Sequence, residues 1–425
     1  MIALALTHNR RPALDQKTMY AAILGLTKPW EVESVEVKLN PGEVHVHVAL
    51  PDKTAWVCPE CLSKAPIHDH QDRSWRHLDT CQYKTLVHAR VPRLDCPQHG
   101  VKQLKVPWAE PGSHFTALFE CLTIDWLTQA SFKAVAAQLR LTWDEVDGIQ
   151  QRAVRRGLER RKLDPPRYVG VDETSFQKGH EYVTVVSDIT DKIRVLYVAD
   201  GHGKDAMDGF WKLFPTEARV KIEAVAMDMW EPFIKSVEKN LPLGDIVHDK
   251  FHVAQYLGDG VDQVRRQESR ELAEAGNPIL KGTKYRWLEN PTRRDRAKTR
   301  KFNVLRAQVH KTSRAWALKE TAMGLWDLIS AGAADRNFKA WYSWARRSRL
   351  EPMKEVAGII KRHWHNIRTY FTHRITNAGS ESINSKIQAV KRRACGFRNR
   401  ARFRTAIYFH CGGLNLYPSV PLATA

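Results

Sequence analysis

The order of strand-like and helix-like segments after Pro165-Pro166 constrains the fold of this chain more than any other feature of its sequence. Three apolar segments follow that break, and short polar stretches separate them: 167–174, 182–189 and 193–199. Helix and strand patterns then alternate, at 204–214, 222–228, 230–240 and 245–248. We therefore expect an α/β domain in which a meander of three strands precedes alternating helices and strands.

Three acidic residues occupy positions in these elements where an unpaired carboxylate would be unusual. Asp172 and Asp228 each close an apolar strand-like run, and Glu381 opens a basic helix. The stretch between the two aspartates suits two strands, a helix and a return strand, so we expect Asp228 on the strand beside that of Asp172. Glu173 is expected on the opposite face, because side chains alternate along a strand. Carboxylates from two strands and a later helix can converge on a pair of hard divalent cations, as phosphodiester chemistry requires.

This order of elements is that of a ribonuclease-H-like fold in an α/β multidomain chain. We assign the first part of the catalytic core to residues 167–264, and its final helix, with Glu381 and a basic C-terminal segment, to residues 373–425. The intervening residues 265–372 are basic, rich in tryptophan and helical in pattern, which predicts an all-helical insertion. Because 425 residues exceed what one hydrophobic core usually supports, further domains are expected on the amino-terminal side.

Residues 1–110 predict a β-rich module with a zinc site. Residues 35–50 and 83–94 alternate polar and apolar side chains, and Asn40-Pro41-Gly42 indicates a hairpin turn. Two ligand pairs follow the same two-residue spacing: Cys58 with Cys61, and Cys96 with His99. Thiolates and an imidazole suit a closed, structural tetrahedral zinc site. The alternatives are two unrelated pairs, or a site in which a nearby residue replaces one ligand: Cys81, His68, His70 or His77.

Residues 111–163 predict a helix-turn-helix DNA-binding domain. Two short helices are expected within 131–161, and the second, from about Trp143 to Arg156, is basic. The second helix of such a motif enters the major groove of DNA. We expect the contacts to come from Gln150, Gln151, Arg152, Arg155 and Arg156. The alternative is a plain packing pair of helices.

The charge of the chain favours DNA as the partner. The sequence has 67 Lys+Arg against 47 Asp+Glu, a net charge of +20, and a polyanion is the simplest explanation for such an excess. No apolar stretch reaches the roughly 18 residues that a membrane span needs. The apolar amino terminus is too short for a secretory signal, so we expect a cytoplasmic protein with no membrane partner.

Several motifs together resemble the transposases of the ISL-three insertion-sequence family. They are Val169–Glu173, the strand ending in Met227-Asp228, Asp249–His252, Thr376–Ile387 and the tail block Lys391–Asn399. The likeness runs from the cysteine pairs to about Gly413. This sequence departs from the family pattern at Ala378 and Ser382, where glycines are expected, and at His99, where cysteine is usual.

The resemblance implies a DDE transposase with Asp172, Asp228 and Glu381 as its triad. Two Mg²⁺ ions held by these carboxylates would activate water and then a 3′-hydroxyl, and a structural Zn²⁺ would bind the amino-terminal module. Related transposases carry an acid or cysteine followed, after two residues, by a histidine, which Asp249 and His252 match. We expect four residues to support the ligands or position DNA: Asp249, His252, Asn377 and Asn384. For the first two, a helix cap and a structural histidine are the alternatives.

Two basic tracts, 293–301 and 391–404, are expected to neutralise phosphates beside the active site, with steep salt dependence. In the second tract the contacts are assigned to Lys391, Arg392, Arg393, Arg398 and Arg400.

We therefore predict an insertion-sequence transposase that binds terminal inverted repeats and cleaves and joins DNA strands as at least a homodimer on DNA. One alternative is a domesticated, catalytically inactive DNA-binding regulator. The other is a structure-selective nuclease that does not join strands.

Overall fold

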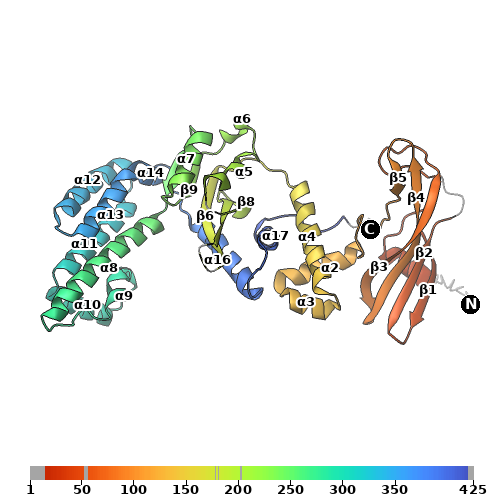
Figure 1. Ribbon diagram of the computed structural model, residues 1–425, viewed down its shortest axis with the longest axis horizontal. Helices are drawn as coiled ribbons and strands as arrows, with labels where there is room; N and C mark the ends of the chain where they lie inside the picture. Colours follow the sequence, from red (N-terminus) through yellow and green to blue (C-terminus); the bar gives the residue numbers. More distant parts are fainter. Residues whose placement is uncertain (1–14, 52–55, 178, 180, 202, 420–425) are drawn as a thin grey trace, which may run out of the picture. The chain divides into compact units, whose positions relative to one another are not determined.

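The computed structural model describes residues 15–51, 56–177, 179, 181–201 and 203–419 (Figure 1). It divides the chain into two compact units, Met1–Arg161 with Leu414–Ala425, and Lys162–Gly413. In the part of the chain that the structure describes, every helix is too short or too polar to cross a bilayer.

A five-stranded sheet forms the first part of the first unit. Its strands are β1 (Glu31–Lys38), β2 (Glu43–Ala49), β3 (Ile67–Thr80), β4 (Tyr83–Cys96) and β5 (Gly100–Gln103). The order is β1-β2-β4-β3, and β5 pairs with β4. The expected hairpin is present as β1 and β2, and helix α1 (Gln16–Ile23) precedes it. Trp30, Trp75 and Trp108 pack edge to face in the core beneath the sheet.

Three helices complete the first unit: α2 (Ala117–Gln129), α3 (Phe132–Leu139) and α4 (Trp143–Arg160). The turn between α3 and α4 ends at Thr142, which caps α4 reciprocally with Glu145. The chain's tail packs back onto this unit, since Arg160 donates to the carbonyl of Tyr417 and the Tyr417 hydroxyl donates to Asp125. The tail from Leu414 therefore belongs with the first unit, whereas the sequence analysis assigned it to the catalytic core.

The second unit is built on a mixed five-stranded sheet. Its strands are β6 (Tyr168–Gln177), β7 (Glu181–Asp188), β8 (Arg194–Asp200), β9 (Ala224–Met227) and β10 (Asp245–His248). The order is β10-β9-β6-β7-β8, in which β6, β7 and β8 form the antiparallel meander and β9 and β10 run parallel to β6. This is the sheet predicted for a ribonuclease-H-like fold.

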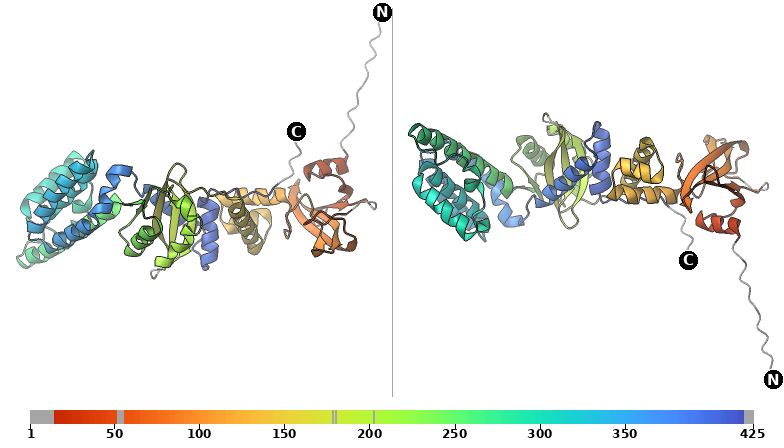
Figure 2. Two further views of the ribbon diagram at one scale, coloured as in Figure 1. Left: turned by 90° about the horizontal axis from the view of Figure 1, so that it is seen from above. Right: turned by 90° about the horizontal axis from the view of Figure 1, so that it is seen from below.

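Helices cover both faces of this sheet (Figure 2). On one face, α5 (Asp208–Trp211) and α7 (Glu231–Asn240) bury apolar side chains against β6, β7 and β8. On the other face lie α16 (Ala378–Arg393) and α17 (Arg400–Cys411). The prediction of a single helix over 204–214 is wrong, because the chain there forms a 3₁₀ turn, Lys204–Ala206, and then the short helix α5. Helix α6 (Thr216–Arg219) follows.

The helical region forms its own core around α8 (Lys250–Glu274). Its other helices are α9 (Lys284–Leu288), α10 (Arg296–Gln308), α11 (Lys311–Met323), α12 (Ala331–Arg347), α13 (Glu351–Arg362), α14 (Trp364–Arg368) and α15 (Tyr370–His373). Because α8 is continuous, the boundary expected between residues 264 and 265 falls inside a helix. Trp287, Trp326 and Trp341 are buried here.

Candidate functional site

The three acids predicted as a triad come from neighbouring parts of the second unit. Asp172 lies on β6, and Asp228 directly follows β9, the parallel neighbour of β6. The parallel register pairs Gly170 with Ala226, so Asp172 and Asp228, each two residues further along, come close together. Glu381 lies in the first turn of α16, and its carboxyl group is within electrostatic range of Asp172.

A close helix–strand contact positions Glu381. Gly170 lies under α16, and a Cβ atom on this glycine would come within 2.1 Å of Ser380 Oγ. Ser380 Oγ also lies 3.1 Å from Ser187 Oγ on β7, so the start of α16 is hydrogen-bonded to the sheet. The missing side chain at Gly170 therefore sets how near Glu381 approaches the aspartates.

Two asparagines of the same segment fix the strand that carries Asp172. Asn384 Nδ2 donates to Asp172 Oδ2 at 2.8 Å and to the carbonyl of Glu173 at 3.2 Å. Asn377, which is buried, donates to the carbonyl of Val171 at 3.4 Å. Both therefore act next to the carboxylates, Asn384 directly and Asn377 through the backbone.

Burial raises the pKa values of Asp172, Asp228 and Glu381. The pKa of Asp172 rises to about 6, because burial and the charges of Asp228 and Asp249 outweigh a backbone hydrogen bond from Glu173 and the charge of His252. Burial also raises the pKa values of Asp228 and Glu381, and His252 again opposes the shift. When acids with raised pKa values lie close together, a bound cation favours their ionised forms and so lowers those pKa values.

Asp249 and His252 belong to the same cluster. Asp249 is 5% exposed and occupies the N-cap position of α8, but its side chain caps no backbone N–H group. Its carboxyl group instead lies beside that of Glu381 and adds to the rise that burial causes in the pKa of Glu381, while its own Oδ2 atom is buried with no hydrogen-bond partner. A contact between two carboxyl groups needs a shared proton or a cation, so the helix-cap alternative does not account for Asp249.

Part of the site was not predicted from the sequence. A cavity of about 460 Å³ is lined by Asp172 and Asp228 together with Glu173, Tyr182, His252, Gln255, Tyr256 and Asp259. Glu173 was set aside because alternation turns it from Asp172, yet it lines the same cavity at the edge of the sheet. Burial, followed by the charges of Asp228 and Asp172, raises its pKa to about 7. Its place directly after Asp172 was the only available signal.

The four predicted zinc ligands meet in the first unit. The ligand atoms of Cys58, Cys61, Cys96 and His99 all lie within 4.8 Å of one another. Cys61 Sγ is 3.6 Å from Cys96 Sγ, and His99 Nδ1 is 3.7 Å from Cys58 Sγ and 3.6 Å from Cys96 Sγ. Ligands about 2.0–2.3 Å from a tetrahedral zinc ion are separated by such distances. None of the alternative ligands is needed.

Three of the five predicted DNA contacts on α4 are either buried or paired with an internal acid. Glu120 is 1% exposed, and Arg152 and Arg156 both donate to its carboxylate. Arg156 also donates to Glu110 and is itself buried, and Gln150 is 2% exposed. The prediction of DNA contact is therefore wrong for Gln150 and Arg156, because both side chains are buried in this unit. Arg152 is half-buried and pairs with Glu120, and its contact with DNA stays a prediction. Gln151 and Arg155 are exposed, and their contact with DNA stays a prediction.

The two basic tracts separate in the structure. Lys391 on α16 donates to the carbonyl of Ser175 on β6, and Arg392, Arg393, Arg398 and Arg400 are exposed near the same sheet. The tract 293–301 was also expected beside the active site, and this is wrong. It lies in and before α10, which packs on α11 at the end of the helical region remote from β6 (Figure 1).

Comparisons with known proteins agree with this geometry. The model of the ISL3 family of DDE transposases matches residues 169–407, which is more than half of the chain. The chain belongs to the ISL3 transposase family. The zinc finger of transposases IS204, IS1001, IS1096 and IS1165 matches residues 54–99, and the helix-turn-helix domain of the ISL3 family matches residues 104–154.

Curated relatives match over nearly their whole length. The transposase for insertion sequence element IS1001 of Bordetella parapertussis is 26% identical and aligns over 92% of this chain and 97% of its own. The transposase for IS1557 of Mycobacterium tuberculosis is 28% identical over 90% of this chain and 92% of its own. A solved strand transfer complex of the Drosophila P element transposase aligns with 69% of this chain at 9% identity and a TM-score of 0.36.

These comparisons confirm the family, the enzyme class and the arrangement of a zinc-binding module, a helix-turn-helix and a DDE transposase domain with a helical region. The protein is thus a DNA-binding transposase of an insertion sequence, and its Cys58, Cys61, Cys96 and His99 form a zinc-ribbon site.

Proposed function

We propose that this transposase cleaves DNA at the ends of its insertion sequence and joins the released 3′-hydroxyls to target DNA, with Asp172, Asp228 and Glu381 as catalytic ligands. The observation that carries the proposal is the convergence of these acids from β6, β9 and α16 into one cluster with raised pKa values. Crowded acids that resist ionisation are suited to divalent cations.

The residues present fit a pair of Mg²⁺ ions. The buried, unpartnered Oδ2 atom of Asp249 and its contact with Glu381 leave negative charge that a cation would neutralise. When bound, Mg²⁺ supplies activation of the attacking oxygen and stabilisation of the leaving 3′-oxygen. Asn384 orients the Asp172 carboxylate, and His252 places a titratable group among the acids. Asp249, His252, Asn377 and Asn384 are thus assigned to support the ligands or position DNA.

DNA would be held by two further parts of the chain. The helix-turn-helix, through Gln151 and Arg155, and the zinc module are proposed to bind terminal inverted repeats. Lys391, Arg392, Arg393, Arg398 and Arg400 are proposed to neutralise phosphates beside the carboxylates. Because two ends must be joined together, we propose a homodimer on DNA. A substrate of chromosomal DNA would place the protein in the bacterial cytoplasm.

The test is cleavage of duplexes carrying the DNA that flanks the coding sequence. With Mg²⁺, the protein is expected to nick one strand at a fixed position near each flank, and Asp228→Asn is expected to abolish nicking while retaining DNA binding. Glu231→Gln, an exposed acid on α7, serves as the matched control and should leave nicking unchanged.

Two outcomes would contradict the proposal. Specific binding without any nicking would favour a catalytically inactive regulator. Nicking without strand joining, when pre-cleaved ends and a target plasmid are supplied together, would favour a structure-selective nuclease.

A further inference from the structure

The helical region concentrates positive charge in residues 281–314, and among the described residues of this segment only two cations, Lys284 and Lys311, pair with acids of α8. Residues 281–314 contain twelve Lys and Arg and only two acids, Glu289 and Asp295. Their net charge of +10 is half of the +20 carried by the whole chain. A surface so unbalanced repels itself unless a polyanion covers it.

Both acids of this segment already have internal roles. Glu289 lies 3.7 Å from the guanidinium of Arg294, which stacks over the ring of Phe302 at 3.8 Å. Asp295 caps α10 by accepting from the backbone N–H of Lys298 at 2.7 Å. Neither acid therefore neutralises the cations that face solvent.

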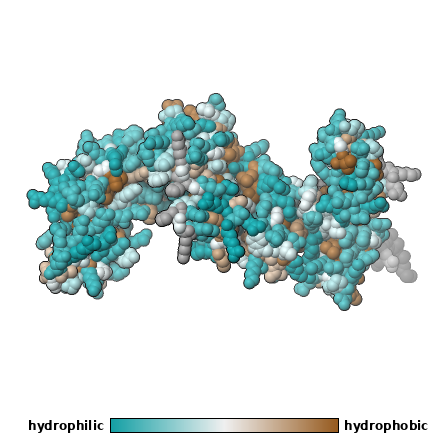
Figure 3. Space-filling model, viewed as in Figure 1, coloured by the Kyte–Doolittle hydropathy of each residue, from teal (hydrophilic) through white to brown (hydrophobic). Residues whose placement is uncertain are grey.

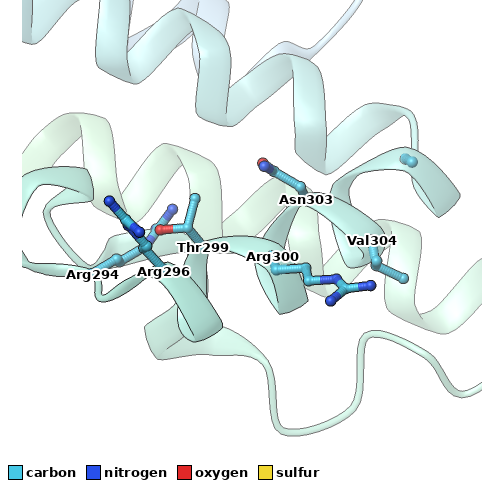
Figure 4. Close-up of a pocket in the computed structure, with 7 residues that line it drawn as sticks. Arg294, Arg296, Thr299, Arg300, Asn303 and Val304 are labelled. Atoms are coloured by element: carbon cyan, nitrogen blue, oxygen red, sulfur yellow. The ribbon is translucent and has the colours of Figure 1, made fainter.

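The exposed face of α10 forms an open hollow with a regular arrangement of donors (Figure 4). Phe302 and Leu305 turn inward, and the opposite face lines a hollow of about 620 Å³ with Arg296, Thr299, Arg300 and Asn303. Arg296 and Arg300 are one helical turn apart, where like charges destabilise an isolated helix. Among the described residues, no acid lies within ion-pair distance of either arginine. The surface over the helical region is largely hydrophilic in the face drawn in Figure 3.

This face is joined to the catalytic carboxylates by a single helix. The first turns of α8 line the catalytic cavity through His252 and Tyr256. Further along the same helix, Glu268 accepts from the backbone N–H groups of Lys311 and Thr312, which follow α10. At about 1.5 Å per residue, the distance from His252 to Glu268 is roughly 24 Å along α8. This equals about seven base pairs of duplex DNA, at about 3.4 Å per step.

We propose that the exposed face of α10, centred on Arg296 and Arg300, is a second DNA-binding surface that holds the phosphates of duplex DNA several base pairs from the cleaved bond. The inference rests on the proposed function, because it requires DNA in the catalytic cavity. The chemistry of this surface is distinct from that of the carboxylate cluster, since arginines bind phosphate oxygens through paired N–H donors without reading base sequence.

The test compares the full-length double variant Arg296→Gln/Arg300→Gln with the control Arg336→Gln/Lys339→Gln. The control removes the same charge from exposed positions on α12. Binding to a 10-base-pair and a 30-base-pair duplex of arbitrary sequence is measured across a series of salt concentrations. All substituted side chains are exposed, and equal thermal midpoints would show that both variants fold.

For the 30-base-pair duplex, the α10 variant is expected to lower the slope of log Kd against log salt by about 2, since each phosphate contact contributes about 0.9. The control should keep the wild-type slope, and the difference between the α10 variant and wild type should be smaller for the 10-base-pair duplex, which extends little beyond the span of α8. Equal slopes for the α10 variant and wild type, or equal losses in both variants, would overturn the proposal. If wild type bound neither duplex, the proposed function itself would fail, which separates the two results.

Discussion

The zinc site and the carboxylate cluster are both sets of metal-binding side chains, but the fold assembles them in different ways. The zinc ligands come from two short turns within one small module, and their atoms already lie within 4.8 Å of one another. The acids come from β6, the end of β9, the start of α8 and α16, and packing between these elements brings them together. The first arrangement suits a closed structural ion, and the second keeps room for substrate in a cavity of about 460 Å³.

This difference predicts which changes each site tolerates. Removing a ligand should destroy the zinc site and the module that depends on it. Shifting a packing contact far from the zinc ion should leave it intact. The carboxylate cluster should instead respond to changes in packing and in the hydrogen bonds that orient its members.

The largest expected effect is on the zinc module. Cys96→Ser removes one of four ligands, and zinc contributes on the order of 10 kcal/mol of apparent folding free energy in zinc-finger peptides. We expect bound zinc to fall from one ion per chain to nearly none, and hydrogen exchange of residues 56–103 to lose protection. Zinc content is measured by elemental mass spectrometry. Cys81→Ser, an exposed cysteine outside the cluster, is the control, and full zinc occupancy in Cys96→Ser would refute this assignment.

The second-largest effect is expected from a change in packing that disturbs the carboxylate cluster and leaves the zinc site intact. Gly170→Ala places a Cβ atom against Ser380, so α16 must move and carry Glu381 with it. We expect a stability loss of about 1–3 kcal/mol, as for other overpacked sites, and a more than tenfold loss of Mg²⁺-dependent nicking (about 1.4 kcal/mol per tenfold). Zinc content should not change.

The control for this variant is Gly358→Ala on α13, where an added Cβ atom meets nothing within 4 Å. Full nicking activity in Gly170→Ala would show that the approach of α16 to the sheet does not position Glu381.

A smaller effect is expected from the loss of a single hydrogen bond to Asp172. Asn384→Ala removes the donor to Asp172 Oδ2, which favours the ionised carboxylate. We expect roughly a tenfold loss of nicking (~1.4 kcal/mol), and the rising limb of the pH–rate profile should move to higher pH. The exposed neighbour Ser385→Ala serves as control. An unchanged pH profile would mean that Asn384 only stabilises the fold.

The smallest effect is on stability as a function of pH. The folded pKa values of Asp172 and Glu173 are raised to about 6 and about 7, above the ordinary carboxyl range. The folded state therefore holds protons that the unfolded state releases, and without metal the stability of the second unit falls as pH rises from about 4 to 7. Mg²⁺ replaces these protons, so its stabilising effect should be greater at pH 8 than at pH 6.

Thermal midpoints with and without Mg²⁺ at both pH values measure this effect. An equal effect of Mg²⁺ at the two pH values would argue that the ion binds elsewhere than at these carboxylates.

Local sequence patterns predicted those parts of the structure that depend on neighbouring residues. The meander of β6 to β8, the parallel position of β9 and the zinc ligands followed from alternation and spacing, because each depends on a short stretch of chain. The placement of Asp172 on a strand, of Asp228 at the end of another and of Glu381 on a later helix also followed from the sequence.

Contacts between distant segments were not accessible in the same way. Glu110 and Glu120, the partners of Arg156, lie on a loop and on α2, so a buried arginine was mistaken for a DNA-contacting one. Glu173 lines the cavity at a point where β6 extends beyond its pairing with β9, which alternation alone does not show. The charge of 293–301 was evident, but its location depends on the course of α8.

The central claim is that Asp172, Asp228 and Glu381 together hold a pair of divalent cations at the DNA. Its most direct measurement is anomalous diffraction from crystals of the protein with an element-end duplex and Mn²⁺. The account predicts two manganese peaks about 4 Å apart, each coordinated by at least one of these three carboxylates and at least one by Glu381. A bound duplex with no manganese at these residues, or manganese held without Glu381, would contradict it.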